Sequence, residues 1–279
     1  MLKKAYIEIT NRCNLRCSFC PGAKRAPRTM TPAEFDLVLE RLTGQGKYVY
    51  LHVMGEPLSH PRLAELLALA AARERKVCIT TNGTLLARQT ETLLAARTLH
   101  KVSVSLHSFE GNDGAPERER EYLDAVWAFA DHAAAQGVIV ALRLWNEGGA
   151  ETRNGAIEAY LRGKCPGEWP EPRSGSFRLR ESLYLERSGR FDWPDLGARE
   201  RGTQFCYGLR DQLGVLADGT VIPCCLDHEG DIALGNLFLQ PLEEILQSER
   251  ARALREGFSR RRPSEELCRR CGFAARFNR

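Results

Sequence analysis

Cysteines are the residues of this chain best suited to chemistry, and Cys13, Cys17 and Cys20 stand close together directly after a strand-like segment. Three soft thiolates at this spacing can hold three corners of a four-iron cluster, which leaves one iron open to bind a further molecule. A structural zinc ion is the alternative, but it normally takes four ligands, and no histidine lies nearby in the sequence. The first group therefore predicts a cluster with an open iron.

A second group of cysteines, Cys206, Cys224, Cys268 and Cys271, lies toward the C-terminus. Four thiolates can ligate an iron–sulfur cluster completely. A CxxC pair with two further cysteines also suits tetrahedral zinc, which is the alternative for this group. Because the first group already indicates a cluster, we favour a second cluster here. Few residues follow Cys271, so we expect one auxiliary cluster rather than two.

Cys225 directly follows Cys224, and neighbouring side chains of an extended segment point to opposite faces. Cys225 is therefore predicted to face away from the auxiliary cluster, where its thiol could project toward the active site. Filling of the core is the alternative, because free cysteine is commonly buried. Cys78 is predicted to be a buried strand residue, and Cys165 has no obvious partner.

Alternating strands and helices must position these thiols in the first part of the chain. The strand candidates are Lys4–Ile9, Tyr48–Val53, Val77–Thr81, Val102–Leu106, Val138–Leu144 and Ser182–Glu186. A helix is expected to begin at Thr31, with Glu34 completing a capping box. Such alternation is typical of βα units around a parallel sheet. It predicts an α/β fold, a partial (β/α)6 barrel with ligands at the carboxyl ends of its strands.

The chain is predicted to divide into a barrel over residues 1–186, a linker over 187–199 and a smaller unit over 200–279. Residues 164–181, rich in Pro, Gly, Arg and Trp, are expected to form an irregular connection. A Gly- and Arg-rich stretch follows the last predicted strand and marks the border of the smaller unit.

The smaller unit is predicted to hold a β-hairpin and a helix. Asp218 and Gly219 suit the positive-φ positions of a tight turn, and they separate the strand candidates Leu213–Ala217 and Thr220–Pro223. Cys224 then falls at the end of the hairpin. A helix is expected from Pro241 to about Glu256.

The CxxxCxxC spacing after the first strand, with the aromatic Phe19 before the third cysteine, resembles the signature of the radical S-adenosylmethionine (SAM) superfamily. Met54, Gly55 and Glu56, after the second strand, resemble the family's GGE-type segment, with Met54 in place of the first glycine. The resemblance implies that Gly55 and Glu56 receive the amino group of SAM.

Three further residues resemble positions that line the SAM pocket in this family: Asn82 after the third strand, Ser105 on the fourth and Arg143 on the fifth. The resemblance implies that Ser105 contacts the ribose or the carboxylate of SAM. Arg143 is the expected partner of that carboxylate, since a guanidinium pairs with it bidentately. Singly, the ordinary alternatives are a turn, a strand residue and a charge at the edge of the core.

The cysteines of the second group, with Gly219 ahead of Cys224, resemble the auxiliary-cluster region called SPASM or, in its shortened form, twitch. The resemblance implies SAM and two 4Fe-4S clusters as cofactors, one cluster binding SAM and one auxiliary. It also implies an external electron donor such as flavodoxin or ferredoxin. The implied chemistry is reduction of SAM to a 5'-deoxyadenosyl radical, which abstracts hydrogen from a carbon atom.

The fate of the substrate radical decides the reaction. Hydrogen return by Cys225 gives epimerisation, and our lead is an L- to D-residue change in a ribosomally made peptide. The alternatives are a dehydrogenase or epimerase of an aminocyclitol or other carbohydrate-like molecule, or thioether formation in a peptide with the auxiliary cluster as electron acceptor. A non-enzymatic electron-transfer or zinc-binding protein is a further alternative. Few residues precede Cys13, so no separate leader-binding domain is expected.

Charge and composition limit the partners. The net charge of +4, from 40 basic and 36 acidic residues, is too balanced to favour nucleic acid or a membrane surface. No apolar run approaches the ~18 residues of a membrane span, and no signal peptide precedes the first strand. Clustered cysteines in a reducing compartment more often hold metal than form disulfides. The sequence predicts a cytoplasmic protein acting on a peptide or a polar small molecule.

Overall fold

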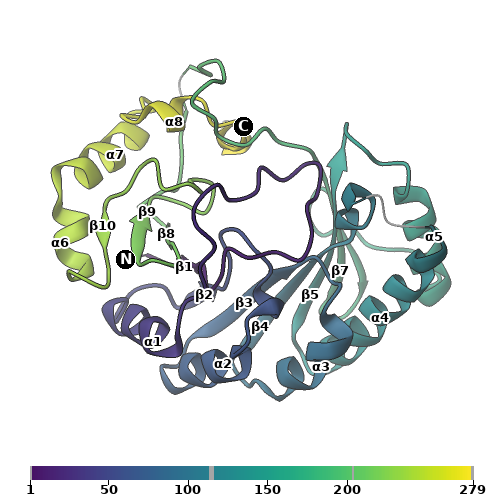
Figure 1. The fold of residues 1–279 in the computed structure, drawn as a ribbon. Helices are drawn as coiled ribbons and strands as arrows, with labels where there is room; N and C mark the ends of the chain where they lie inside the picture. Colours follow the sequence, from purple (N-terminus) through teal and green to yellow (C-terminus); the bar gives the residue numbers. More distant parts are fainter. Residues whose placement is uncertain (1, 113–115, 203, 278–279) are drawn as a thin grey trace.

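The computed structural model of the chain describes residues 2–112, 116–202 and 204–277, which form one mixed sheet flanked by helices (Figure 1). The strands are β1 (Lys4–Ile7), β2 (Tyr48–Tyr50), β3 (Lys76–Thr81), β4 (Leu99–Ser105), β5 (Ile139–Glu147), β6 (Ser176–Arg180), β7 (Leu183–Gly189), β8 (Gln212–Val215), β9 (Thr220–Ile222) and β10 (Gly235–Asn236). Their order across the sheet is β10-β9-β8-β1-β2-β3-β4-β5-β7-β6. All six predicted parallel strands are present, so the predicted α/β partial barrel is confirmed.

The helices cover the outer face of this curved, open sheet (Figure 1). They are α1 (Pro32–Arg41), α2 (Leu63–Ala72), α3 (Leu86–Ala95), α4 (Pro116–Ala135), α5 (Asn154–Lys164), α6 (Leu242–Gln247), α7 (Glu249–Ser259) and α8 (Glu266–Arg269). Phe35 of α1, Leu66 of α2 and Phe129 of α4 are fully buried between helix and sheet. Burial of such side chains contributes roughly 1.5–3 kcal/mol each, so the core fixes the outer face of the barrel.

The start of α1 shows how local sequence signals are used. The Thr31 hydroxyl accepts from the Glu34 N–H at 3.2 Å, and the Glu34 carboxylate accepts from the Thr31 N–H at 2.8 Å, which is the predicted capping box. The same carboxylate pairs with Arg28 at 2.5 Å, and Arg28 donates to the Ala217 carbonyl at 2.7 Å. The helix cap thus also anchors the loop that precedes it.

Two expectations outside the barrel strands are wrong. The stretch expected to be irregular contains β6, which pairs antiparallel with β7 across a turn where Ser182 has a positive φ of 59°. The neighbouring Pro and Gly residues obscured the alternation within Ser176–Arg180. The single helix expected to start at Pro241 is two helices, because Ser248 ends α6 and caps α7 by accepting from the Ala251 N–H at 3.2 Å.

The predicted hairpin is present as β8 and β9, which are antiparallel. Its turn requires glycine, because Gly219 has a φ of +86° and a Cβ there would lie 2.6 Å from the Asn236 Oδ1. In addition, β8 pairs in parallel with β1, with Lys4 opposite Gln212. The segment that carries the second cysteine group is therefore joined to the strand that leads into the first.

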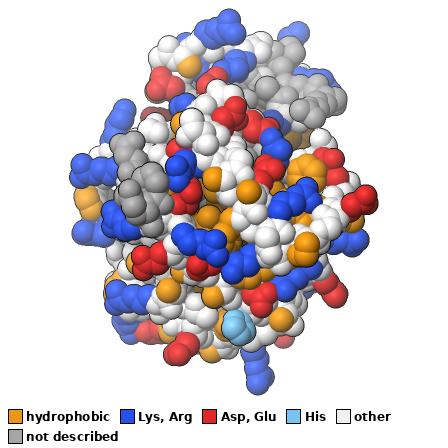
Figure 2. All heavy atoms as spheres, turned by 90° about the vertical axis from the view of Figure 1, so that its right-hand side faces the viewer, with side chains coloured by type: hydrophobic (Ala, Val, Ile, Leu, Met, Phe, Trp, Pro, Cys, Tyr) orange, Lys and Arg blue, Asp and Glu red, His pale blue; other side chains and the backbone are white. Residues whose placement is uncertain are grey.

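Among the described residues, no helix combines the length and the apolar character that crossing a membrane would require. On the face drawn in Figure 2, lysine and arginine side chains are interspersed with aspartate and glutamate. This mixture agrees with the balanced overall charge.

Candidate active site

Every site residue that the sequence analysis predicted lines one cavity of about 1130 Å³. It lies at the carboxyl ends of the barrel strands, where the segment after β1 crosses the sheet in Figure 1. Its lining includes Cys13, Cys17, Phe19, Cys20, Gly55, Glu56, Asn82, Ser105, Arg143, Cys206, Cys224, Cys225, Cys268 and Cys271. Both cysteine groups thus face a common space.

The first three thiols lie on an open loop. Cys13 and Cys20 are exposed and Cys17 is half-buried. The Cys17 sulfur accepts from Asn112 Nδ2 at 2.9 Å, and the Cys13 sulfur accepts from the Leu15 N–H at 3.5 Å. Burial raises the pKa of the Cys13 and Cys20 thiols. Soft thiols with N–H donors directed at them fit an iron–sulfur cluster, since such hydrogen bonds tune cluster sulfurs.

Gly55 is required because the cysteine loop lies directly against it. Its φ is +79°, and a Cβ there would lie 2.3 Å from the Thr10 carbonyl oxygen. The following N–H, of Glu56, donates to the Arg12 carbonyl at 2.9 Å. The backbone after β2 therefore holds the backbone that enters the first cysteine group.

The Glu56 carboxylate accepts hydrogen bonds from three groups of the protein. It accepts from the Leu58 N–H at 3.0 Å, from the Thr81 hydroxyl at 2.8 Å and from the Asn82 N–H at 2.8 Å. The side chain is buried, and that burial raises its pKa. In this arrangement Glu56 positions the end of β3 and also lines the cavity.

Asn82 ties the first cysteine loop to the end of β3. Its side-chain Nδ2 donates to the Asn14 Oδ1 at 2.9 Å, while its Oδ1 accepts from the Thr84 hydroxyl at 2.7 Å. The Asn14 Nδ2 donates in turn to the Thr84 hydroxyl at 2.8 Å. The small network fixes the residue next to Cys13.

Phe19 fixes the other end of the loop. Its ring packs on His107, with ring centroids 4.8 Å apart. A Cβ at Gly111 would lie 2.6 Å from the Phe19 ring, so the segment that also carries Asn112 approaches the loop closely. Neither Asn112 nor Gly111 was predicted, because they come from a distant part of the sequence and carry no motif.

Arg143 lies on β5 beside the end of β4, where half-buried Ser105 is its register partner. The Arg143 Nε donates to Glu186 at 3.0 Å, and the guanidinium lies 4.3 Å from the Trp145 ring centroid. Lys101 reaches the same carboxylate at 3.1 Å. The expected SAM-carboxylate partner is thus held by an ion pair within the barrel.

The second group of thiols is half-buried, in contrast to the first. The Cys206 sulfur accepts from the Gly208 N–H at 3.4 Å, and burial raises its pKa to about 11. Burial and the neighbouring thiols raise the pKa of Cys224 and Cys268. Loading with a cluster would have to displace these thiol protons.

Cys225 occupies a different environment from Cys224. It packs with Tyr6 and Trp193 against a small apolar cluster that includes Val53 and Met54. Burial raises the pKa of the Cys225 thiol to about 12. Its thiol therefore contacts the elements that surround the first cysteine loop.

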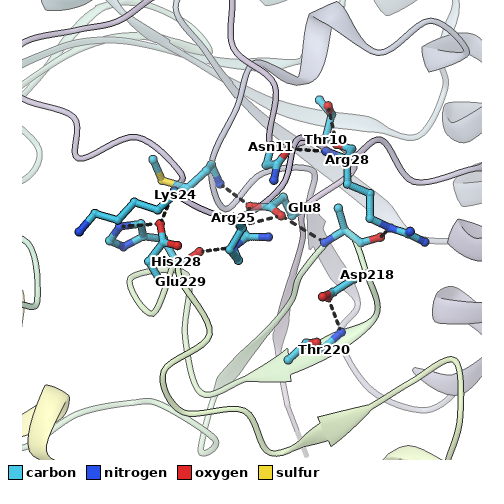
Figure 3. Close-up of polar contacts among 12 residues, drawn as sticks. Glu8, Thr10, Asn11, Lys24, Arg25, Arg28, Asp218, Thr220, His228 and Glu229 are labelled. Carbon is cyan, nitrogen blue, oxygen red and sulfur yellow. Dashed lines mark hydrogen bonds and ion pairs between the residues drawn. The ribbon is translucent and has the colours of Figure 1, made fainter.

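A buried ion pair that the sequence analysis missed joins these regions (Figure 3). Glu8, at the end of β1, is completely buried, and its carboxylate accepts from Arg25 at 2.7 and 2.9 Å. The same carboxylate accepts from the Met54 N–H at 3.2 Å and the Ala217 N–H at 3.1 Å, and Arg25 Nε donates to the His228 carbonyl at 2.8 Å. The only signal for it was a carboxylate inside an otherwise apolar strand segment.

The loop after Cys225 also contacts the loop that follows Cys20. The Lys24 N–H donates to the Glu229 carboxylate at 2.9 Å (Figure 3). Asp227 accepts from the N–H groups of Asp231 and Ile232, and burial raises its pKa to about 6. These carboxylates fix the backbone that follows Cys225.

The remaining cysteines lie apart from both groups. Cys78 is buried on β3, where it is hydrogen-bonded to Tyr50, in agreement with its predicted place in a strand. Cys165 is half-buried at the end of α5, and its carbonyl accepts from the Trp169 Nε1 at 3.0 Å. Neither thiol lines the cavity.

A parallel partial barrel with clustered thiols at its open carboxyl end defines an iron–sulfur enzyme. The sequence model of the radical SAM superfamily matches residues 7–144, and that of the SPASM iron–sulfur cluster-binding domain matches residues 206–272. The chain belongs to the radical SAM superfamily and carries a C-terminal SPASM domain. It is an enzyme whose cofactors are SAM and two iron–sulfur clusters, one of them auxiliary.

Sequence similarity to curated proteins is confined to part of the chain. A GTP 3',8-cyclase of Chlorobaculum tepidum is 37% identical over 108 residues, which cover 37% of this chain and 32% of that protein. A tungsten-containing aldehyde ferredoxin oxidoreductase cofactor-modifying protein of Pyrococcus furiosus is 36% identical over 90 residues, covering 30% and 25%. The chain thus matches about a third or less of the length of these relatives.

Solved structures resemble the whole chain. BtrN in complex with AdoMet and 2-DOIA has a TM-score of 0.62 at 17% identity, covering 97% of this chain and 93% of BtrN. Native anSMEcpe with AdoMet and the Cp18Cys peptide has a TM-score of 0.61 at 15% identity, covering 97% and 86%. SuiB of Streptococcus suis bound to the precursor peptide SuiA has a TM-score of 0.58 at 15% identity, covering 98% and 70%. At these identities the resemblance establishes the fold.

Proposed function

We propose that this enzyme is an epimerase that removes a hydrogen atom from a substrate carbon and returns one to the opposite face through Cys225. The observation that carries the proposal is the position of that thiol. It lines the same cavity as Cys13, Cys17 and Cys20, and it packs on Tyr6 rather than joining the environment of Cys224. A thiol so placed faces the substrate space and contacts the elements that surround the first cysteine loop.

Ligation follows the two cysteine groups. Cys13, Cys17 and Cys20 hold the SAM-binding 4Fe-4S cluster, because they are the thiols on the open loop. Cys206, Cys224, Cys268 and Cys271 hold the auxiliary 4Fe-4S cluster, because four thiols complete its ligation. When bound, SAM and the first cluster supply the 5'-deoxyadenosyl radical that abstracts hydrogen, after electron delivery by an external donor such as flavodoxin or ferredoxin.

The other site residues orient SAM. Ser105 and Arg143 supply polar contacts from the ends of β4 and β5, both of which line the cavity. Gly55 lets the backbone after β2 approach the cysteine loop, and Glu56 positions Asn82. Phe19 packs the loop onto His107. These residues hold SAM in one orientation, which directs the radical to one carbon atom.

The cavity walls exclude water from the reacting groups. Its aromatic lining includes Trp145, Phe191, Trp193 and Phe273. Phe191 and Phe273 pack edge to face with centroids 5.1 Å apart, and Trp193 packs on His228 at 5.3 Å. Such walls protect a reactive radical from side reactions. They also offer flat apolar surfaces for a substrate.

A peptide is our leading substrate, with an L- to D-residue change as the reaction. Two structures of similar fold contain bound peptides, SuiB with SuiA and anSMEcpe with Cp18Cys. The reducing cytoplasm is the compartment we propose, because the thiols that hold the clusters must stay reduced.

The second candidate is oxidation of a carbohydrate-like small molecule, such as an aminocyclitol, with the auxiliary cluster as electron acceptor. The favouring observation is that all four thiols of the second group line the substrate cavity. The chain matches BtrN over almost its full length, and that structure is a complex with AdoMet and 2-DOIA. Thioether formation in a peptide would use the same electron path.

Anaerobic turnover in heavy water separates these reactions. Candidate peptides and polar small molecules are supplied with SAM and a low-potential reductant, and product mass is measured. Gain of one deuterium at one carbon supports epimerisation, whereas loss of two hydrogen atoms supports oxidation and contradicts our lead.

A variant tests the role of Cys225 directly. Cys225→Ala should keep both clusters and form 5'-deoxyadenosine but release no epimerised product. Cys165→Ala, which removes a half-buried thiol outside the cavity, is the matched control and should behave as the wild type. Loss of the auxiliary cluster in Cys225→Ala would identify Cys225 as a ligand and refute its role as donor.

A further inference from the structure

Positively charged side chains line the interior of the barrel. Lys101 and Arg143 share one carboxylate, that of Glu186, at 3.1 and 3.0 Å. Lys4, on β1, lines the cavity, as does Arg143. Within the described part of the chain, Lys4 forms no ion pair.

None of the other described carboxylates of the cavity wall forms an ion pair with Lys4. Glu56 accepts from three donors of its own neighbourhood, and Asp227 accepts from two backbone N–H groups. Asp211 pairs at 3.5 Å with Lys3, whose side chain is 71% exposed. The positive charge of Lys4 therefore has no carboxylate partner among the described residues of the cavity wall.

Neutral polar groups face the same space. Tyr6 and Tyr50 are stacked with centroids 4.7 Å apart, and His52 lies edge-on to Tyr6 at 5.7 Å. The His52 Nδ1 is buried without a hydrogen-bond partner in the described residues. Burial and the nearby Arg143 lower the pKa of His52 to about 3, so its imidazole adds no charge. A buried polar atom without a partner is uncommon and indicates a place for a ligand or water.

We propose that this inner end of the cavity, bounded by Lys4, Tyr6 and Tyr50, binds an oxyanion of the substrate, a carboxylate or a phosphate. An uncompensated ammonium in a partly buried cavity attracts an anion strongly, because the screening by water is weak there. Arg143 adds to the positive potential while serving SAM. The inference rests on the proposed function, because Tyr6 links Lys4's surroundings to Cys225. An anion anchored at Lys4 brings the adjoining carbon toward that thiol.

Anion binding to the complete enzyme tests the site without turnover. The cluster-reconstituted protein, saturated with SAM so that the SAM carboxylate has its own partner, is titrated anaerobically with inorganic phosphate and with acetate at constant ionic strength. Calorimetry should show saturable binding. The tighter anion identifies the source, phosphate for a phosphoryl group and acetate for a carboxylate.

Substitutions at two lysines make the test specific. Lys4→Met should weaken binding at least about tenfold, whereas Lys4→Arg, which keeps the charge, should retain it. Lys47→Met is the matched control, because Lys47 is exposed and does not line the cavity, and it should leave the affinity unchanged. Absence of saturable binding to the wild type, or equal affinity in Lys4→Met, would overturn the proposal. Neither result bears on the deuterium test of Cys225, so the two failures are distinguishable.

Discussion

The two cysteine regions are built in opposite ways. The first places three thiols on one short loop, two of them exposed, and the support comes from other segments through Gly55, Asn82 and Asn112. The second draws half-buried thiols from separate segments, and Cys206 and Cys268 pack against the main hydrophobic core. A loop held at its edges keeps an open side for a ligand, whereas thiols embedded in packed structure suit a closed site.

The comparison also shows how the regions meet. The parallel pairing of β8 with β1 places their backbones side by side, and the Glu8–Arg25 ion pair connects the loop after Cys20 to the loop after Cys225. Neither connection involves a cysteine. The pairing of β8 with β1 and the ion pair of the buried Glu8 carboxylate therefore help to set the relative position of the two cysteine groups.

Removal of one thiol from each region should give the largest and most contrasting effects. Cys17→Ser should abolish the first cluster and all formation of 5'-deoxyadenosine while leaving the auxiliary cluster in place, because its loop does not support the core. Cys268→Ser should lose the auxiliary cluster and also lower the yield of folded protein, because Cys268 packs into the core. Iron content, electron paramagnetic resonance and SAM cleavage measure both.

The contrast fails if Cys17→Ser unfolds the protein as readily as Cys268→Ser does. Cys165→Ser, at a half-buried thiol outside the cavity, is the control for substitution of cysteine itself. It should retain both clusters.

Glu8→Gln should have the next largest effect, because it leaves Arg25 buried beside a neutral partner. Breaking a buried ion pair costs about 3–5 kcal/mol, so the free energy of unfolding should fall by roughly this amount. Asp36→Asn, which breaks the more exposed pair with Arg73, is the control and should cost about 1 kcal/mol or less. Chemical denaturation of the apoprotein measures both. Similar losses in the two variants would show that Glu8 is not the joint between the regions.

Much of this arrangement could be predicted, for physical reasons that differ between residues. The cysteines follow local spacing rules, and the strands follow runs of β-branched residues, so both were recognisable in the sequence. The capping box at Thr31 and the turn at Gly219 are equally local. Such signals depend on residues close together in the chain.

The missed features depend on residues far apart. Glu8 and Arg25 become a joint only when β8 pairs with β1, and that pairing has no local signature. The hydrogen bonds from the Thr81 hydroxyl and the Asn82 N–H to the Glu56 carboxylate likewise join segments that are far apart in the sequence. Sequence patterns therefore identified which residues gather at the site better than which contacts hold them there.

The smallest expected effect is a change in the midpoint potential of the first cluster alone. The Asn112 Nδ2 donates to Cys17 Sγ at 2.9 Å, and a hydrogen bond to a cluster sulfur stabilises the reduced state, which is the more negative one. Asn112→Ala should lower the midpoint potential of the first cluster. A loss of about 1 kcal/mol corresponds to a shift on the order of 40 mV for one electron. Potentiometric titration followed by electron paramagnetic resonance measures it.

The auxiliary cluster in the same sample is the internal control for this shift. Among the described residues of the two cysteine regions, Asn112 is hydrogen-bonded only to the first, through Cys17 and the Arg16 N–H, and it also donates to the Ser108 carbonyl, so the potential of the auxiliary cluster should not change. If both potentials move together, the substitution acts through the overall fold. If only the potential of the first cluster falls, a hydrogen-bond donor from outside the first cysteine loop tunes that cluster. This is the result that the contrast between the two regions predicts.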